Sequence, residues 1–258
     1  MCRDLLASRE LAWRLCLRNI RAEYRQSFLG LAWALIPPAL TTAGFAFANN
    51  AGILNIQETS IPYPAYVILS TTLWQTFLEA FNGPQKAINI SRTLLSQVKF
   101  PHEAIILSQL GQISFNLVVK LCLLIIVFLI FSVPVSWTAL LAPISIASLI
   151  CLGTSLGLVL IPITNLIKDV SRSIELIIIG WFFLTPVAYP PPSEGVFSVL
   201  VKINPVTPLL VTARELITTG EISYLVGFYV TVVGSLIGLL VGWIIFRLSI
   251  PFLVERIS

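Results

Sequence analysis

The chain has 258 residues, of which 57% are hydrophobic and only 11% are charged. Soluble proteins carry about 25% charged residues, so this composition argues against a soluble enzyme or binding domain and indicates an integral membrane protein. The net charge of +4 does not predict nucleic-acid binding, because the basic residues lie at the edges of apolar runs and not in one basic domain.

An amphipathic helix is expected ahead of the first apolar run. Trp13, Leu17, Ile20 and Tyr24 recur at helical spacing and form an apolar stripe. A basic stripe follows the same spacing and consists of Arg14, Arg18, Arg21 and Arg25. Such a helix lies flat in a membrane interface, with its apolar stripe in lipid and its guanidiniums against phosphates. We therefore predict an interfacial helix within residues 1–27.

Six apolar runs are long enough to cross a hydrocarbon core of about 30 Å, which takes about 20 helical residues. Each is expected to be a helix, because a backbone in lipid must satisfy its own hydrogen bonds. The predicted spans are residues 28–48, 63–81, 105–131, 138–166, 174–189 and 223–246. The expected fold is an all-α polytopic membrane protein in which residues 1–258 form a single transmembrane domain.

The lysines and arginines are divided unequally between the two sides of these spans. Thirteen fall on one side, whereas only Lys202 and Arg214 fall on the other, and Lys120 lies inside the third span. The positive-inside rule therefore predicts that both termini are cytoplasmic.

Residues 85–100 belong to a predicted cytoplasmic loop that is bracketed by Pro84 and Pro101. Ile88, Leu95 and Val98 share one face of a short helix there. A short apolar face without its own core is typical of a docking element. A second interfacial helix lying on lipid explains the same pattern equally well.

The third outer loop, residues 190–221, alternates prolines with short apolar stretches at residues 196–201 and 209–216. This pattern favours two short re-entrant helices that dip into the outer leaflet and close a cavity, over an ordinary surface loop. The candidate outer gate residues are Tyr189, Pro190, Asn204, Pro205 and Arg214.

Catalytic motifs are missing from the sequence. It has no Walker A loop, no GxSxG and no HExxH, and His102 is its single histidine. We therefore expect a transport subunit that is not an enzyme and that binds no cofactor or metal.

Polar residues within the third predicted span are costly in lipid. Gln112, Asn116 and Lys120 follow one another at four-residue intervals and line one helical face. That face lies against a translocation pathway or a neighbouring helix, unless Lys120 instead snorkels to the inner headgroups.

Aromatic residues gather in the second span around Glu79 and recur in other spans. Their rings are able to stack on sugars, although packing and interface anchoring explain such residues as well. The candidate pathway aromatics are Trp33, Trp74, Phe77, Phe81 and Trp181.

Four stretches together resemble one family of membrane proteins. They read LRNIRAEYRQSFLGLAWALIPP (17–38), LLSQVKFPHEAIILSQL (94–110), IKDVSRSIELIIIGWFFLTPVAYP (167–190) and INPVTPLLVTARELITTG (203–220). The chain resembles the membrane subunit of ABC-2 type exporters, in the branch that exports O-antigen, capsular polysaccharide or teichoic acid. It departs from that pattern at Glu23, where arginine is frequent, and at His102.

The resemblance implies a six-helix subunit in the bacterial cytoplasmic (inner) membrane, assembled as a homodimer with two copies of a separate ABC ATPase that carries ATP and Mg. It implies a lipid-linked glycan as substrate, with Arg18, Arg21 and Arg25 near its diphosphate. It also assigns ATPase coupling within the 85–100 segment, to Arg92, Leu94, Leu95, Lys99 and Phe100. The alternatives are an ABC-2 permease for a lipid or drug and, less well supported, an ATPase-independent channel or carrier.

Overall fold

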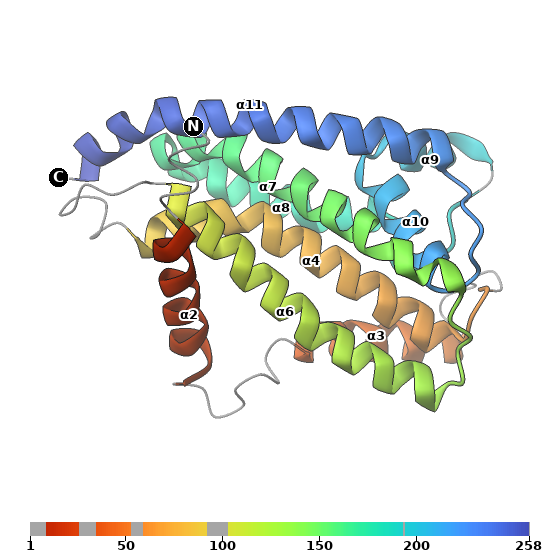
Figure 1. The fold of residues 1–258 in the computed structure, drawn as a ribbon. Helices are drawn as coiled ribbons and strands as arrows, with labels where there is room; N and C mark the ends of the chain where they lie inside the picture. The colour runs from red at the N-terminus through yellow and green to blue at the C-terminus, as the bar shows by residue number, and fades with distance from the viewer. Residues whose placement is uncertain (1–8, 26–34, 53–58, 92–102, 193, 258) are drawn as a thin grey trace.

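The computed structural model describes residues 9–25, 35–52, 59–91, 103–192 and 194–257, and this part of the chain contains helices and no strands. The long helices α4, α6, α7 and α11 run roughly along one common direction, whereas α2 crosses them steeply at one end (Figure 1). They are α2 (Arg9–Arg25), α3 (Ile36–Asn50), α4 (Tyr63–Ile90), α6 (Glu103–Ile130), the 3-10 helix η2 (Trp137–Leu141), α7 (Ala142–Leu166), α8 (Lys168–Leu184), α9 (Gly195–Ile203), α10 (Val206–Ile217) and α11 (Leu225–Ile257).

Three of the described helices are long and apolar enough to cross a membrane: α6, α7 together with η2, and α11. The pair α9 and α10 adds a fourth candidate if it is counted as one broken span. The two helices meet at an angle of 88°, so residues 190–221 contain two short helices as predicted. Their depth in the membrane stays a prediction.

Helix α4 does not end where the sequence predicts. The second span was expected to stop at Phe81 and a separate segment to begin beyond Pro84, but one helix runs from Tyr63 to Ile90 with Pro84 inside it. An interior proline costs a helix about 3 kcal/mol or more. Pro84 is buried against Gly157 of α7, and this packing stabilises the helix through the expected break.

Helix α7 lies at the centre of the bundle and contacts α4 through two glycines. A Cβ on Gly153 would lie 2.7 Å from the carbonyl oxygen of Phe77, and one on Gly157 would overlap the carbonyl oxygen of Phe81. The backbones of α4 and α7 are therefore in direct contact. This is the G-x-x-x-G arrangement by which helices associate in membranes, where lipid removes the hydrophobic drive to pack.

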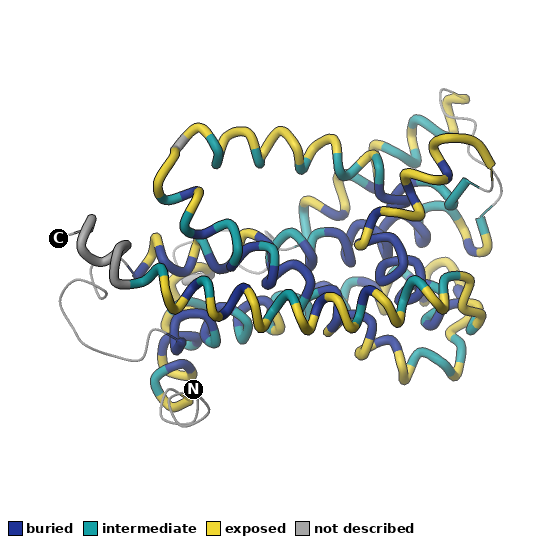
Figure 2. Tube along the Cα trace, turned by 90° about the horizontal axis from the view of Figure 1, so that it is seen from above, coloured by how far each residue is buried: buried dark blue, intermediate teal, exposed yellow. Residues whose placement is uncertain are grey.

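A second glycine pair joins α7 to α11 on another face. A Cβ on Gly242 would lie 2.9 Å from the carbonyl oxygen of Ser155, and one on Gly238 would lie 3.2 Å from the Ser155 hydroxyl. Buried residues accordingly concentrate between these helices, while the outer faces of α8 and α11 are exposed (Figure 2).

Helix α2 packs on α6 through a different face from the predicted apolar stripe. Ala12, Leu15 and Cys16 are buried against α6, whereas Trp13 is 63% exposed. Burial raises the pKa of the Cys16 thiol. Leu17 and Ile20 of the predicted stripe are half-buried, so only Trp13 among the described side chains of the stripe is largely exposed, and the place of the stripe in lipid stays a prediction.

The glycine contacts predict a sharp difference between two Gly→Ala substitutions. Gly157→Ala should lower stability by about 1–3 kcal/mol, because its methyl group would collide with the α4 backbone. Gly234→Ala on α11 is the matched control, since no atom lies within 4 Å of its Cβ position. Thermal unfolding of the detergent-purified protein measures both. Equal melting temperatures for the two variants would contradict the close α4–α7 approach.

Candidate functional site

Helix α4 carries a polar stripe in the middle of an apolar bundle. Gln75, Glu79, Asn82 and Lys86 are spaced i, i+4, i+7 and i+11, which places them on one face. A row of polar side chains on a helix that packs against apolar helices is a candidate for a functional site. The stripe is therefore the starting point for the site.

Three cavities open along this helix. The inner cavity, of about 640 Å³, lies between α4, α7 and α8. The amide cavity, of about 420 Å³, lies between α2, α3, α4 and α6. The aromatic cavity, of about 370 Å³, lies between α3, α4 and α8.

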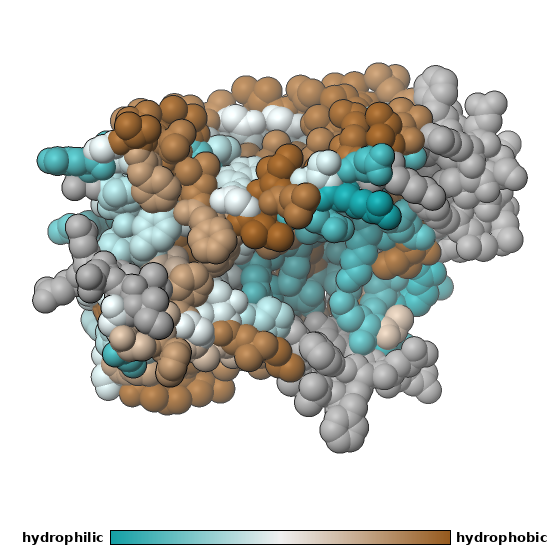
Figure 3. Space-filling view, turned by 180° about the vertical axis from the view of Figure 1, so that it is seen from behind, coloured by the Kyte–Doolittle hydropathy of each residue, from teal (hydrophilic) through white to brown (hydrophobic). Residues whose placement is uncertain are grey.

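Shared lining residues join these cavities into one series. Asn82 and Lys86 line both the inner and the amide cavity, and Gln75 and Leu78 line both the amide and the aromatic cavity. Seen from behind, hydrophilic side chains gather between apolar bands on one face of the molecule (Figure 3). We call the three cavities together the α4 groove.

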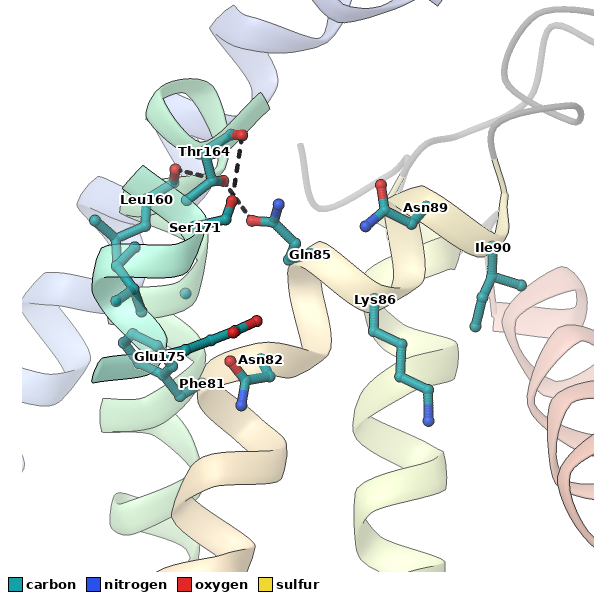
Figure 4. A pocket seen from close by; sticks show the side chains of 12 residues that line it. Phe81, Asn82, Gln85, Lys86, Asn89, Ile90, Leu160, Thr164, Ser171 and Glu175 are labelled. Atoms are coloured by element: carbon teal, nitrogen blue, oxygen red, sulfur yellow. Dashed lines mark hydrogen bonds between the residues drawn. The ribbon is translucent and has the colours of Figure 1, made fainter. Parts of the chain in front are cut away.

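The inner cavity is lined by hydrogen-bonding side chains from three helices (Figure 4). The Thr164 hydroxyl of α7 donates to the amide oxygen of Gln85, and the Ser171 hydroxyl lies 3.5 Å from the Thr164 carbonyl oxygen. Glu175 of α8 lies near Asn82 of α4, while Lys86 points away from the Gln85–Thr164 pair (Figure 4). The cavity thus offers amide, hydroxyl and carboxylate groups at one end of the bundle.

A partly buried ion pair joins α4 to α6 beside the amide cavity. Lys120 Nζ lies 2.5 Å from Glu79 Oε1, and Asn116 Nδ2 lies 3.4 Å from Glu79 Oε2. The Lys120 side chain is 1% exposed, so its ammonium contacts a neighbouring helix and does not reach toward headgroups. Glu79, at 31% exposure, also lines the cavity.

Glu23 connects α2 to the same cavity. Its carboxylate accepts hydrogen bonds from Lys86 Nζ at 3.2 Å and from the side-chain amide of Gln112. One residue of α2 is therefore tied to both α4 and α6. Neither Glu23 nor Lys86 was predicted as a site residue, although the spacing of Lys86 with Gln75, Glu79 and Asn82 would have revealed it.

Four of the aromatic residues proposed from the sequence, Trp74, Phe77, Phe81 and Trp181, form one packed cluster. Phe77 and Trp181 have ring centroids 5.4 Å apart, and Trp74 lies 5.8 Å from Phe182. Phe77 is fully buried and Trp74 is 3% exposed, so these rings belong mainly to the core. Trp74 still lines the aromatic cavity with Phe182 and Phe183, and Phe81 lines the inner cavity. Trp33 lies outside the described residues.

The predicted outer gate residues meet at the opposite end of the bundle. Arg214 of α10 is buried, donates to Ser70 Oγ at 3.0 Å and to the Pro186 carbonyl oxygen at 3.1 Å, and stacks 4.1 Å from the Tyr66 ring centre. Asn204, in the α9–α10 turn before Pro205, accepts from Trp181 Nε1 at 2.9 Å. These contacts tie the α9–α10 pair to α4 and α8.

Tyrosine hydroxyl groups complete this outer network. Tyr66 donates to the Tyr189 carbonyl oxygen at 2.9 Å, and Tyr189, next to Pro190, donates to the Phe183 carbonyl oxygen at 2.8 Å. The segment after α8 is therefore held against the start of α4 by hydrogen bonds as well as by packing.

The described arginines that the sequence placed near the lipid headgroups do not line the groove. Arg14, Arg18 and Arg21 are exposed on α2, where Arg14 pairs with Glu10 at 2.6 Å. The side chain of Arg25 is outside the described part of the structure, as are the predicted coupling residues Arg92, Leu94, Leu95, Lys99 and Phe100.

Comparison with known proteins identifies the class to which this helical bundle belongs. The sequence model of the ABC-2 type transporter family matches residues 10–218, so the chain belongs to that family. Its apolar helices make it a multi-pass membrane protein.

Curated relatives match over most of the chain. The O-antigen export system permease protein RfbA of Myxococcus xanthus is 26% identical over 220 residues, covering 84% of this chain and 83% of the relative. Two proteins of the same name from Klebsiella pneumoniae are 22% and 20% identical over 230 residues, each covering 84% of this chain and 86% of the relative.

The Glu79–Lys120 pair predicts an unequal response to removal of each partner. Glu79→Gln leaves a fully buried ammonium without its counter-charge and should cost about 3–5 kcal/mol. Lys120→Met should cost less, because the remaining carboxylate of Glu79 is partly exposed in the cavity. Thermal unfolding of the purified protein measures both changes.

The double variant Glu79→Gln/Lys120→Met is the control for this pair. Removing both charges should restore most of the stability lost in Glu79→Gln, since no unpaired charge remains. Losses that simply add in the double variant would show that the two groups do not interact.

Proposed function

We propose that this chain is the permease subunit of an ATP-driven exporter that moves a lipid-linked polysaccharide across the bacterial cytoplasmic membrane. The observation that carries the proposal is the α4 groove, which joins polar cavities to an aromatic one. Amides and carboxylates suit sugar hydroxyl groups, and exposed rings suit the apolar faces of sugars. The O-antigen export function in the names of the relatives agrees with a glycan cargo.

The topology that we propose has six spans with both termini in the cytoplasm. The spans are α3 with the residues before it, α4, α6, α7, α8 and α11, while α9 and α10 form a re-entrant outer pair. Two observations support this: the ends of α4 and α11 lie with α2 at one end of the bundle (Figure 1), and this end carries most of the basic residues. Helix α2 would then lie along the inner membrane surface.

The assembly that we propose contains two copies of this chain and two copies of an ABC ATPase, which would hold ATP and Mg. The outward faces of α3 and α8 flank the groove and expose large apolar residues such as Leu40, Leu176 and Phe183. These faces suit a second copy that closes the groove into a pathway. Residues 85–100 are the proposed ATPase contact, through Arg92, Leu94, Leu95, Lys99 and Phe100.

The proposed transport path runs from the inner cavity toward the aromatic cavity. The diphosphate of the lipid carrier would meet the basic side chains at the inner end, including Arg14, Arg18, Arg21 and Arg25. The sugar chain would then slide past rings that bind each unit weakly enough to release it. The Arg214 and Asn204 contacts would have to loosen for the outer end to open.

Removal of the gene provides the test of cargo and of mechanism. A strain lacking this chain should accumulate lipid-linked glycan on the cytoplasmic side and lose the surface polysaccharide. In the wild-type strain, affinity purification of the chain should recover an ATP-binding subunit in a one-to-one ratio. A chain that purifies alone and transports without any ATPase would overturn the proposal, as would unchanged surface glycan in the deletion strain.

A further inference from the structure

A separate groove of about 950 Å³ lies between α2 and α6, and it shares no lining residue with the three cavities of the α4 groove. Buried Ala12 and Cys16 of α2 line it together with Leu107 and Gly111 of α6. A Cβ on Gly111 would lie 2.8 Å from Cys16 Sγ, so a larger residue there would push α2 away from α6. We call this space the α2–α6 groove.

The α2–α6 groove opens onto an exposed stripe of α6. Leu107 and Gly111 are followed at helical spacing by five exposed residues: Ser114, Val118, Cys122, Ile125 and Leu129. The Ser114 hydroxyl donates to the Leu110 carbonyl oxygen of its own helix, so it needs no outside partner. Because α6 is long and apolar enough to cross a membrane, this stripe suits contact with acyl chains.

The α2 side of the groove carries an available positive charge. Arg9 is exposed, lines the groove and forms no ion pair with any residue that the structure describes. Glu10 lines it as well, but its carboxylate is bound to Arg14 Nη2 at 2.6 Å. Trp13 follows Arg9 by four residues on the same face and is largely exposed. An exposed indole beside a basic side chain is typical of the headgroup level of a membrane.

We propose that the α2–α6 groove binds one phospholipid with an anionic headgroup. The Arg9 guanidinium contacts the phosphate, one acyl chain packs on Trp13 and Leu107, and the rest of that chain follows the exposed stripe of α6. Gly111 lies eight residues into α6, about 12 Å along the helix, so an acyl chain passes it while the headgroup stays at α2. The lipid would then fasten α2 to the bundle from the membrane side.

A phospholipid fits this groove better than the lipid-linked cargo does. The lining is mainly apolar, and none of the side-chain amides that line the amide cavity reaches it. The groove therefore offers little to a sugar. The inference goes beyond the proposed function and rests on it only for the inner-leaflet position of the lipid, which follows from the proposed topology.

Native mass spectrometry of the purified complex of this chain with its ATPase tests the site. The probes are phosphatidylglycerol and phosphatidylcholine with identical acyl chains, so that the headgroup is the only difference. We expect tighter retention of phosphatidylglycerol. Arg9→Gln should weaken phosphatidylglycerol binding about fivefold and leave phosphatidylcholine binding unchanged, because a charge contact is removed. Arg9→Lys keeps the charge and should retain most of the binding.

Two further variants serve as controls for Arg9→Gln. Arg172→Gln removes an exposed arginine of α8 that lines neither groove, so it should leave binding of both lipids unchanged. Trp13→Ala removes apolar contact area from the groove and should weaken binding of both lipids together.

Three results would overturn the assignment: equal retention of the two lipids by the wild-type complex, phosphatidylglycerol binding by Arg9→Gln as tight as by wild type, or an equal loss in Arg172→Gln. A Trp13→Ala complex that loses its ATPase while the chain keeps the lipid would assign the groove to the ATPase instead. None of these measurements involves a glycan or transport. Failure of this site therefore leaves the exporter intact, and failure of the deletion test leaves the lipid result standing.

Discussion

The arrangement of this protein depends on the close contact between the backbones of α4 and α7. Gly153 and Gly157 leave no side chain between the two helices, so the Phe77–Phe81 region of α4 lies directly on α7. Glycines 238 and 242 bring α11 equally close to another face of α7. With one face of α4 committed to this contact, its polar stripe faces α2, α6 and α8, where the cavities form.

Polar groups in this bundle are compensated in pairs. Lys120 is matched by Glu79, Lys86 by Glu23, and buried Arg214 by the Tyr66 ring together with two oxygen acceptors. Each pairing joins two different helices, so it also specifies how those helices lie against each other. Among the described residues, six buried side-chain atoms have no hydrogen-bond partner, and two of them belong to Gln109 and Gln112, which line the amide cavity.

Periodicity in the sequence was sufficient to find the polar face of α6, because Gln112, Asn116 and Lys120 repeat every four residues. It did not reveal Glu79 as the partner of Lys120, since pairing between helices depends on tertiary packing. The same limit explains Pro84, where burial against Gly157 overrides a helix-breaking residue. The same limit applies to the burial of Phe77, because the residue type alone does not show whether an aromatic ring lines a pathway or packs in the core. The four-residue glycine spacing in α7 and α11 is visible in the sequence, and such spacing predicts close contact between helices.

If the glycan travels along the α4 groove, as we propose, residues that line the groove lie within reach of the sugar chain during export. The most direct measurement is photo-crosslinking in cells that make the glycan, with p-benzoylphenylalanine placed at Asn82 in the groove or at Leu240 on the exposed face of α11. Glycan adducts that depend on ATP hydrolysis are expected from Asn82, and none from Leu240. Adducts from Leu240 alone, or equal labelling at both positions, would contradict this path.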